Sequence, residues 1–363
     1  MVKNIIARAS EMRASDIHIV CGIPVRVRVD GSIVDLDSHV MTAEDCLACA
    51  KEFGDDAVEI AQKIGEADLA VTVCNRRLRV NLFKQQEKFS LAIRMLNDKI
   101  PNLLDLNLPE IISTFPEYRN GLILVTGETG SGKSTTLAAL LNQINKSKKG
   151  HIITLEDPIE YVYTPDKCVI NQREIGRDTQ SFSTGLRAAL REDPNVILVG
   201  EMRDLDTIET ALTAAETGHL VFGTIHTNSA ADAIDRIVDV FPEGRQRQIR
   251  LQLSLGLKAV VSQQLLPKIG GGRVAACEIM VTDFAIANLI REGKTPQIQQ
   301  TLQTSADNGC ITMGRAIENL LKAGFITKET AKKASGVIDK TDAVAAMQNG
   351  FRMSMDSPVR PKI

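Results

Sequence analysis

A glycine-rich stretch between a predicted strand and a predicted helix constrains the fold of this chain more than any other feature. It reads Gly127-Glu-Thr-Gly-Ser-Gly-Lys-Ser-Thr135 and matches the G-x-x-x-x-G-K-[ST] pattern of phosphate-binding loops. The apolar run 121–126 precedes it, and a helical pattern begins at Thr136. Glycines let backbone N–H groups turn toward phosphate oxygens, and the new helix adds the positive end of its dipole. The flanking strand and helix make the alternative, a flexible Gly/Ser turn, the weaker interpretation.

The residues of this loop have separate expected roles. Lys133 is expected to reach the β- and γ-phosphates of a nucleotide, and Ser134 is expected to ligate Mg²⁺. The candidate nucleotide-binding residues are Gly127, Thr129, Gly130, Ser131, Gly132, Lys133, Ser134 and Thr135. The motif therefore predicts a nucleotide-binding protein.

Composition sets broad limits on the class of protein. The 363 residues allow two domains, and 44% hydrophobic with 24% charged residues is typical of globular proteins. With 43 basic and 45 acidic residues, the chain is not expected to coat nucleic acid, although a local basic groove stays possible. No apolar run of membrane-spanning length and no signal peptide is recognisable. We therefore expect a cytoplasmic protein without a membrane span.

The seven cysteines are odd in number and scattered, so they do not suggest a secreted disulfide framework. Cys46 and Cys49 form one C-x-x-C, but they lie in a stretch that reads as a helix capped by Thr42. A zinc site would need two more ligands, and none stands at matching spacing. We interpret both as small apolar residues on a helix face.

The hydrophobic patterns divide the chain into successive regions. Residues 1–97 predict a small α+β domain, with alternating strands at 16–20, 24–30, 32–36, 78–83 and 89–95 and a turn at Asp30-Gly31. A linker is expected at 98–112, which contains Pro101 and Pro109.

After the linker the hydrophobic pattern of the sequence changes. Residues 113–280 predict an α/β domain, because continuous apolar strands at 122–125, 151–155, 195–199 and 220–224 alternate with helices, as in a largely parallel sheet covered by helices. Residues 281–345 predict a helical segment, and the polar tail 346–363 is expected to be mobile.

Two groups of carboxylates follow predicted strands of the α/β domain. The first is the cluster Glu156, Asp157 and Glu160, and the second is Glu201 after the strand 195–200. Hydrolysis of a nucleotide needs carboxylates that hold Mg²⁺ and orient water, and ligands bind at the carboxyl edge of such sheets. The alternative for both groups is a solvated charge at a strand end.

Two histidines frame the next predicted strand. His219 precedes the strand 220–224, and His226 follows it. Such a histidine is often structural and bonded to a neighbouring carbonyl. Here we predict that both lie near the γ-phosphate, and a metal site is less favoured because no third ligand is spaced with them.

Together these motifs resemble the secretion ATPase superfamily of type II and type IV secretion and type IV pili. The resemblance rests on the phosphate loop, Leu-Glu-Asp-Pro-Ile-Glu160, Val-Gly-Glu-Met-Arg-Asp204, Ala-Glu-Thr-Gly-His219 and Gly-Thr-Ile-His-Thr227. It extends to Ala14-Ser-Asp-Ile-His18 and Val29-Asp-Gly31, which look like a PAS-like N-terminal domain, and to the segment 270–276. It implies a RecA-like ATPase domain, a homo-hexameric ring and hydrolysis of Mg-ATP between subunits.

The resemblance also implies roles for individual residues. Lys133 and Ser134 would hold phosphate and Mg²⁺, Glu160 would belong to an aspartate box, and Glu201 would be the catalytic glutamate that ends a Walker B strand. Together Ser134, Glu160 and Glu201 would hold Mg²⁺, partly through water. His219 and His226 would form a histidine box. Arg79 and Arg94 match arginines that the family places at the nucleotide, although strand arginines are often only solvated charges.

Within the superfamily the chain resembles the pilus retraction ATPases of twitching motility. That implies a motor at the inner face of the cytoplasmic membrane, docked on a pilus platform protein and possibly assembled with a paralogous ATPase. One departure concerns the retraction motif Ala-Ile-Arg-Asn-Leu-Ile, because this chain has Ala287 where the motif has arginine.

Three alternatives stay open at the level of sequence. A pilus extension or secretion ATPase would resemble a longer chain with a further N-terminal domain and a four-cysteine zinc motif. A RecA-like nucleic-acid translocase would need stacking aromatics, and this chain has 4% aromatic residues and no Trp. A regulatory subunit beside a more active paralogue is favoured mildly by Ala287 and opposed by Lys133 and Glu201.

Overall fold

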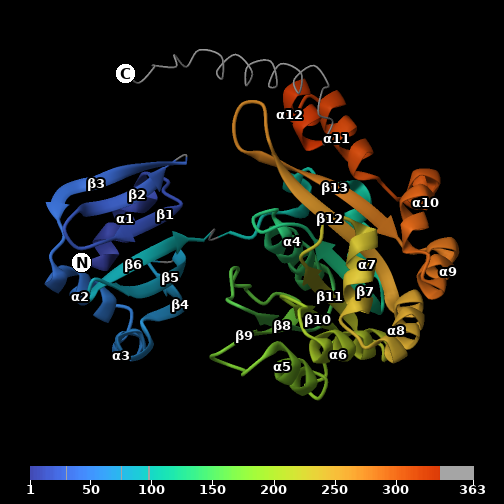
Figure 1. Ribbon diagram of the computed structural model, residues 1–363, viewed down its shortest axis with the longest axis horizontal. Helices are drawn as coiled ribbons and strands as arrows, with labels where there is room; N and C mark the ends of the chain where they lie inside the picture. Colours follow the sequence, from blue (N-terminus) through green and yellow to red (C-terminus); the bar gives the residue numbers. More distant parts are fainter. Residues whose placement is uncertain (30, 75, 97–98, 336–363) are drawn as a thin grey trace, which may run out of the picture. The chain divides into compact units, whose positions relative to one another are not determined.

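The computed structural model describes residues 1–29, 31–74, 76–96 and 99–335 of the chain (Figure 1). The chain divides into two compact units. The first comprises Met1–Asp105, Phe115–Leu122 and Ser134–Thr224, and the second comprises Leu106–Thr114, Ile123–Lys133 and the described part of Ile225–Ile363. The predicted tail 346–363 and the last ten residues of the predicted helical segment lie outside the described residues.

The N-terminal hundred residues form an antiparallel sheet with helices on one face. The elements are α1 (Val2–Glu11), β1 (Asp16–Ile19), β2 (Pro24–Val29), β3 (Ser32–Val40), α2 (Ala43–Lys51), α3 (Asp55–Ile64), β4 (Glu66–Val73), β5 (Arg76–Gln85) and β6 (Lys88–Met95). The strand order is β3-β2-β1-β6-β5-β4. The strands predicted from period-two alternation are confirmed as β1, β2, β3, β5 and β6, whereas β4 was not predicted.

The same alternation explains which face of this sheet is buried. Leu78, Val80 and Leu82 of β5 are fully buried and pack in one core with apolar residues of α1, α2 and α3. Arg79 lies between them in sequence and points to the opposite, exposed face. This face of the sheet therefore carries polar side chains that are available to contacts outside the domain core.

Helix α2 begins where the sequence predicts. Thr42 and Asp45 form a capping box: the backbone N–H of Asp45 donates to Thr42 Oγ1 at 3.1 Å, and the backbone N–H of Thr42 donates to Asp45 Oδ2 at 2.9 Å. Cys46 and Cys49 are fully buried in the core, and burial raises the pKa of the Cys46 thiol to about 11 and that of Cys49 to about 12. Both therefore act as apolar core residues. Of the seven free thiols, Cys74 alone is exposed.

The second sheet has seven strands. They are β7 (Gly121–Thr126), β8 (Gly150–Glu156), β9 (Cys168–Glu174), β10 (Val196–Val199), β11 (Leu220–Ile225), β12 (Leu257–Pro267) and β13 (Arg273–Val281), in the order β13-β12-β7-β11-β10-β8-β9. Strand β8 is parallel to β9 and β10, β10 is parallel to β11, and β12 and β13 form an antiparallel hairpin. The four predicted strands are confirmed as β7, β8, β10 and β11, and every residue of β7, β10 and β11 is buried.

Helices alternate with these strands and continue after them. They are α4 (Lys133–Ser147), α5 (Phe182–Ala189), α6 (Leu205–Glu216), α7 (Ala230–Asp239), α8 (Glu243–Gly256), α9 (Phe284–Glu292), α10 (Ile298–Thr304), α11 (Met313–Lys322) and α12 (Lys328–Ala334). The short 3₁₀ helices are η1 (Leu103–Leu106), η2 (Glu110–Glu117), η3 (Thr295–Gln297) and η4 (Ala306–Asn308). The fold is thus mixed α/β, and the chain after β13 is helical as far as it is described.

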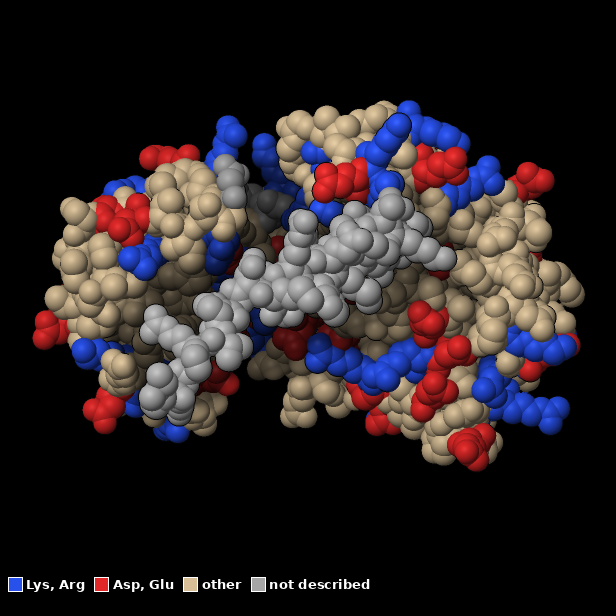
Figure 2. All heavy atoms as spheres, turned by 45° about the horizontal axis from the view of Figure 1, so that its top comes forward, with Lys and Arg blue, Asp and Glu red and all other residues tan. Residues whose placement is uncertain are grey.

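The C-terminal helices are held to the β12–β13 hairpin. Apolar residues of α11, among them Ile317 and Leu320, pack with Leu266 of β12 and Val274 of β13, and Figure 1 shows α11 and α12 beside this hairpin. No helix within residues 1–335, as far as they are described, is both long and apolar enough to cross a bilayer. Basic and acidic side chains are interspersed on the face that Figure 2 draws.

The capping box of α2 supports a stability prediction. Thr42→Ala removes the oxygen that accepts from the Asp45 N–H, so it should lower the free energy of unfolding by about 1 kcal/mol. Chemical unfolding followed by circular dichroism measures the loss. Glu44→Ala, an exposed change in the same turn, is the control and should cost less than about 0.5 kcal/mol. Equal losses for both variants would contradict the role of the cap.

Candidate nucleotide site

The phosphate loop 127–132 joins β7 to α4 and has a shape that only glycine permits at two positions. Gly127 and Gly132 have φ angles of 141° and 93°, which L side chains rarely adopt. A Cβ on Gly127 would lie 2.2 Å from the carbonyl oxygen of Gln263, and one on Gly132 would lie 2.8 Å from Gln263 Nε2. Strand β12 thus approaches the loop so closely that no side chain fits between them.

The interior of the loop is lined by polar groups. The Lys133 ammonium donates to the carbonyls of Gly127 at 2.7 Å and Glu128 at 2.9 Å, while Gln263 Nε2 donates to the Ser131 carbonyl at 2.9 Å. The Ser131 hydroxyl is buried and has no hydrogen-bond partner among the described residues. A cradle that a Cβ would fill, a lysine ammonium and an unsatisfied buried hydroxyl fit an anionic phosphate chain.

Ser134, Thr135 and Thr136 in the first turn of α4 differ in their exposure to solvent. Ser134 is exposed, whereas Thr136 is buried. Thr135 Oγ1 shares a hydrogen bond of 2.9 Å with the Tyr161 hydroxyl. Since Tyr161 follows Glu160 in sequence, this bond brings the end of the first acid cluster to the turn that carries Ser134. Their placement is compatible with a shared Mg²⁺ site.

Within the acid cluster the structure singles out Glu156, which sequence reasoning did not separate from its neighbours. Its Oε1 accepts from Thr154 Oγ1 at 2.6 Å and from Gln172 Nε2 at 3.2 Å. Burial nevertheless raises the pKa of Glu156 to about 7, and the nearby Glu160 carboxylate adds to the rise. A carboxyl that changes charge near neutral pH therefore lies at the end of β8.

Strand β9 holds the segment that follows Glu156. Gln172 Nε2 donates to the Tyr161 carbonyl at 2.8 Å, and the backbone N–H of Ile159 donates to Glu174 Oε2 at 3.2 Å. Arg77 of β5 pairs with Glu174 at 2.9 Å and donates to the Ile159 carbonyl at 3.0 Å. Gln172, Glu174 and Arg77 were not identified from the sequence as residues of the site. Strand β9 shows no continuous apolar run, and the position of Arg77 two residues before Arg79 was the one indication that it could belong there.

Glu201 lies where a Walker B strand is expected to end. Gly200 follows β10, and its N–H donates to the Leu155 carbonyl of β8 at 2.8 Å. A Cβ on Gly200 would be 2.9 Å from that carbonyl oxygen, so glycine permits the close crossing. The Glu201 carboxylate pairs with Arg203, whose side chain is 76% exposed while that of Glu201 is 20% exposed. The two predicted acid groups are thus brought to one edge of the sheet.

The two histidines lie at opposite ends of β11. The N–H of Gly121, the first residue of β7, donates to the His219 carbonyl at 3.0 Å, and His219 Nδ1 lies 2.9 Å from the Ala214 carbonyl oxygen. His226 is exposed just after the other end of the strand, about 20 Å away for a strand of this length. The ring of His219 is thus bonded at the start of the strand, and its expected place near the γ-phosphate stays a prediction.

Arg79 and Arg94 face each other across β5 and β6 and are both exposed. Arg94 Nε donates to Asp16 Oδ1 at 3.1 Å. Partial burial would raise the pKa of Asp16, but hydrogen bonds from Ser15 and Arg94 outweigh it and lower that pKa. The arginines therefore form a basic row on the open face of the N-terminal sheet.

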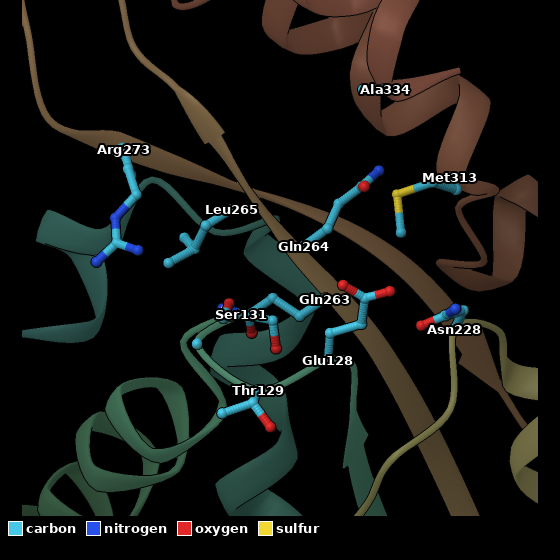
Figure 3. A pocket seen from close by; sticks show the side chains of 11 residues that line it. Glu128, Thr129, Ser131, Asn228, Gln263, Gln264, Leu265, Arg273, Met313 and Ala334 are labelled. Atoms are coloured by element: carbon cyan, nitrogen blue, oxygen red, sulfur yellow. The ribbon is translucent and has the colours of Figure 1, made fainter. Parts of the chain in front are cut away.

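A pocket of about 440 Å³ lies beside the phosphate loop (Figure 3). Loop residues 128–131 and Gln263–Leu265 of β12 line it, together with Asn228, Arg273, Met313 and Ala334. Figure 3 shows Asn228 and Met313 on the side toward α11, and Thr129 on the side of the loop. No group of three or more His, Cys, Asp or Glu residues within the described ranges is placed to hold a metal ion.

Comparison with known proteins gives consistent matches. The family model "Type II/IV secretion system protein" matches residues 1–316. The type IV pilus retraction ATPase PilT of Pseudomonas aeruginosa is 44% identical over 93% of this chain and 98% of its own length. A twitching motility protein of Neisseria gonorrhoeae is 46% identical, covering 85% of this chain and 83% of that protein. A crystal structure of the pilus retraction motor PilT with bound ADP superimposes with a TM-score of 0.86 at 47% identity, covering 92% of this chain and 96% of that chain.

Glu156 makes stability depend on pH in a defined direction. Its pKa rises from 4.5 to about 7 in the folded protein, so the folded state keeps a proton that the unfolded state loses. The stabilisation is complete below pH 4.5 and is lost as the pH rises to 7. Glu156→Gln should remove this dependence and be more stable than wild type above pH 7 by about 3 kcal/mol. Urea unfolding between pH 5 and 8 measures it, with exposed Glu11→Gln as control; equal slopes for wild type and Glu156→Gln would refute the shift.

Proposed function

Because the chain belongs to the type II/IV secretion system protein family, we propose that it is an ATPase motor that powers retraction of a type IV pilus. The observation that carries this proposal is the phosphate loop, in which Gly127 and Gly132 have no room for a Cβ and the Ser131 hydroxyl is buried without a partner among the described residues. The similarity to PilT over nearly the whole of both chains supports the retraction role.

The chain's own residues account for nucleotide binding. Lys133 would turn its ammonium from the loop carbonyls to the β- and γ-phosphates, and the Gly127, Thr129, Gly130, Ser131, Gly132 and Thr135 positions would complete the cradle. Exposed Ser134, with Glu160 and Glu201 directly or through water, would hold Mg²⁺, which when bound neutralises charge on the phosphates. This division of roles leaves Glu201 as the residue that orients the attacking water.

The ion pair of Glu201 bears on that role. Arg203 pairs with the Glu201 carboxylate, so this highly exposed arginine would release the carboxylate when Glu201 orients the attacking water. His226 lies after β11, and the backbone N–H of Met202 donates to the Thr224 carbonyl at 3.0 Å, which brings the chain after Glu201 to the same strand end. We assign His226 a role at the reacting phosphate and leave His219 out of the catalytic group.

We further propose a PAS-like N-terminal domain followed by a RecA-like core, assembled as a homo-hexamer. In that ring Arg79 and Arg94, on an exposed sheet face, would complete a nucleotide site and stabilise charge in the transition state, a contribution of about 10³ to 10⁵ in rate for such arginines. The ring would work in the cytoplasm, docked peripherally on an inner-membrane platform protein, and could include a paralogous ATPase.

Other functions have less support. A nucleic-acid translocase would need a basic face with stacking aromatics, whereas Figure 2 shows charges of both signs interspersed on the face it draws. Pilus extension or secretion is a second candidate within the family, and the similarity to PilT over 98% of that protein's length favours retraction over it. A regulatory subunit is disfavoured by the complete set of Lys133 and Glu201.

Two substitutions test the ATPase mechanism. Lys133→Ala should lose both nucleotide affinity and turnover, because the ammonium that meets the phosphates is gone. Glu201→Gln should bind ATP as wild type does and hydrolyse it roughly a hundredfold more slowly. Nucleotide titration and phosphate release separate the two effects. Lys146→Ala and Glu243→Gln, both exposed, are the matched controls, and near-normal turnover in Glu201→Gln would refute its assignment.

Ala287 tests the link to mechanical output. It lies in α9, where Asn288 donates to Glu292 at 3.1 Å and pairs with Arg291. Ala287→Arg keeps helix propensity, so ATP turnover should stay within about twofold of wild type while retraction frequency in cells changes. Ala285→Arg adds the same cation at an exposed position of the helix and serves as control. Identical retraction for the wild type and Ala287→Arg would show that the arginine has no role here.

A further inference from the structure

Glu278 is a buried carboxylate that none of the roles above explains. It lies in β13 and is 2% exposed. Its Oε1 accepts from the backbone N–H of Ala230 at 3.0 Å, and its Oε2 lies 3.4 Å from both the backbone N of Met313 and Gln299 Nε2. Three segments far apart in sequence thus meet at one side chain.

The two backbone donors are the first residues of helices. Ala230 begins α7 and Met313 begins α11. Each helix already has its own cap, because Ser229 Oγ accepts from Asp232 at 3.1 Å and Thr312 Oγ1 accepts from Arg315 at 3.3 Å. Glu278 therefore serves the N–H groups that these caps leave unpaired, and its negative charge faces the positive ends of two helix dipoles. This arrangement compensates a buried carboxylate, which is otherwise costly.

Residues at or just before the first turns of both helices line the pocket beside the phosphate loop. Asn228 stands two residues before Ala230, in the connection between β11 and α7, and Met313 is the first residue of α11. Both line the pocket whose other side is formed by loop residues 128–131, and Figure 3 shows them together on its α11 side. Glu278 thus fixes the positions of two walls of the space that adjoins the loop.

We propose that Glu278 is a positioning residue that couples the connection after β11 to helix α11, so that the nucleotide state of the loop is passed to the C-terminal helices. The proposal rests on the nucleotide-binding function proposed above. If α7 and α11 moved relative to each other, the Glu278 carboxylate would lose its hydrogen bond to one of the two helices. Because Ile317 and Leu320 of α11 pack on the β12–β13 hairpin, a displacement of α11 would involve its buried face and not only its first turn.

Hydrogen exchange with and without ADP, read by mass spectrometry on the full chain, tests the coupling. In the wild type, ADP should slow exchange in α4 (133–147) and in α11 (313–322). Glu278→Gln puts an amide donor against one of the two helix N–H groups. It should keep the α4 response and reduce the α11 response at least threefold. ATP turnover per folded molecule should fall about tenfold with KM within about threefold, measured at a temperature at which circular dichroism shows the variant fully folded, so that loss of active protein does not account for the fall.

A second variant distinguishes the effect of side-chain length at position 278 from the effect of its negative charge. Glu278→Asp keeps the negative charge but is one methylene shorter, so it can serve only one helix and should lose the α11 response as Glu278→Gln does. If Glu278→Gln does not fold, the result for Glu278→Asp decides the test. Glu318→Gln, which removes an exposed carboxylate of α11 paired with Lys322 at 2.6 Å, is the control and should respond as wild type.

The outcomes distinguish the two proposals. If ADP changes exchange in wild-type α4 but not in α11, or if both Glu278 variants keep the α11 response, the coupling is wrong. If turnover per folded molecule stays at the wild-type value in both variants, Glu278 is only a structural residue. If ADP leaves wild-type α4 unchanged, the nucleotide-binding function itself fails.

Discussion

The close approach of strand β12 to the phosphate loop is the constraint on which the site depends. The Gln263 carbonyl occupies the space that a Cβ on Gly127 would need, and its amide group lies where a Cβ on Gly132 would be, while it also donates to the Ser131 carbonyl. A single residue of a neighbouring strand thus supports both ends of the loop. Thr126 and Ser262 extend this contact with a buried hydrogen bond of 2.7 Å one residue earlier on each strand. The cradle is therefore preorganised by packing and not only by its own glycines.

The parts of the fold that could be predicted are those with a local signal. Strands β7, β8, β10 and β11 are continuous apolar runs because both faces of a parallel sheet are covered, and the N-terminal strands alternate because one face is open. Strand β12 was missed for a physical reason. It starts directly after Gly256, the last residue of α8, so no turn marks its beginning. Its centre is also polar, because Ser262 and Gln263 form hydrogen bonds with β7 and with the phosphate loop.

The candidate site shows the same limit. The phosphate loop, the first acid cluster and Glu201 stand beside recognisable strand ends, so sequence alone indicates that they belong to one edge. Which end of β11 faces that edge depends on strand direction, and the sequence alone does not show that His219, bonded to Ala214 and beside Gly121, lies at the opposite end of the strand from His226. Gln172 and Glu174 support the acid cluster from β9, a strand whose apolar pattern is too weak to recognise in the sequence. The raised pKa of Glu156 arises from burial, which no sequence motif encodes.

The distribution of thiols has a practical consequence. Cys46, Cys49, Cys168, Cys277 and Cys310 are buried, Cys21 is half-buried, and Cys74 is exposed between β4 and β5. Thiolates react with maleimides and thiols in apolar surroundings do not ionise readily, so the native chain offers one preferred point for a fluorophore. That point lies beside β5 of the N-terminal sheet, which carries Arg79 and Arg94 on its exposed face, so a fluorophore there would report on the sheet that we propose acts at the nucleotide.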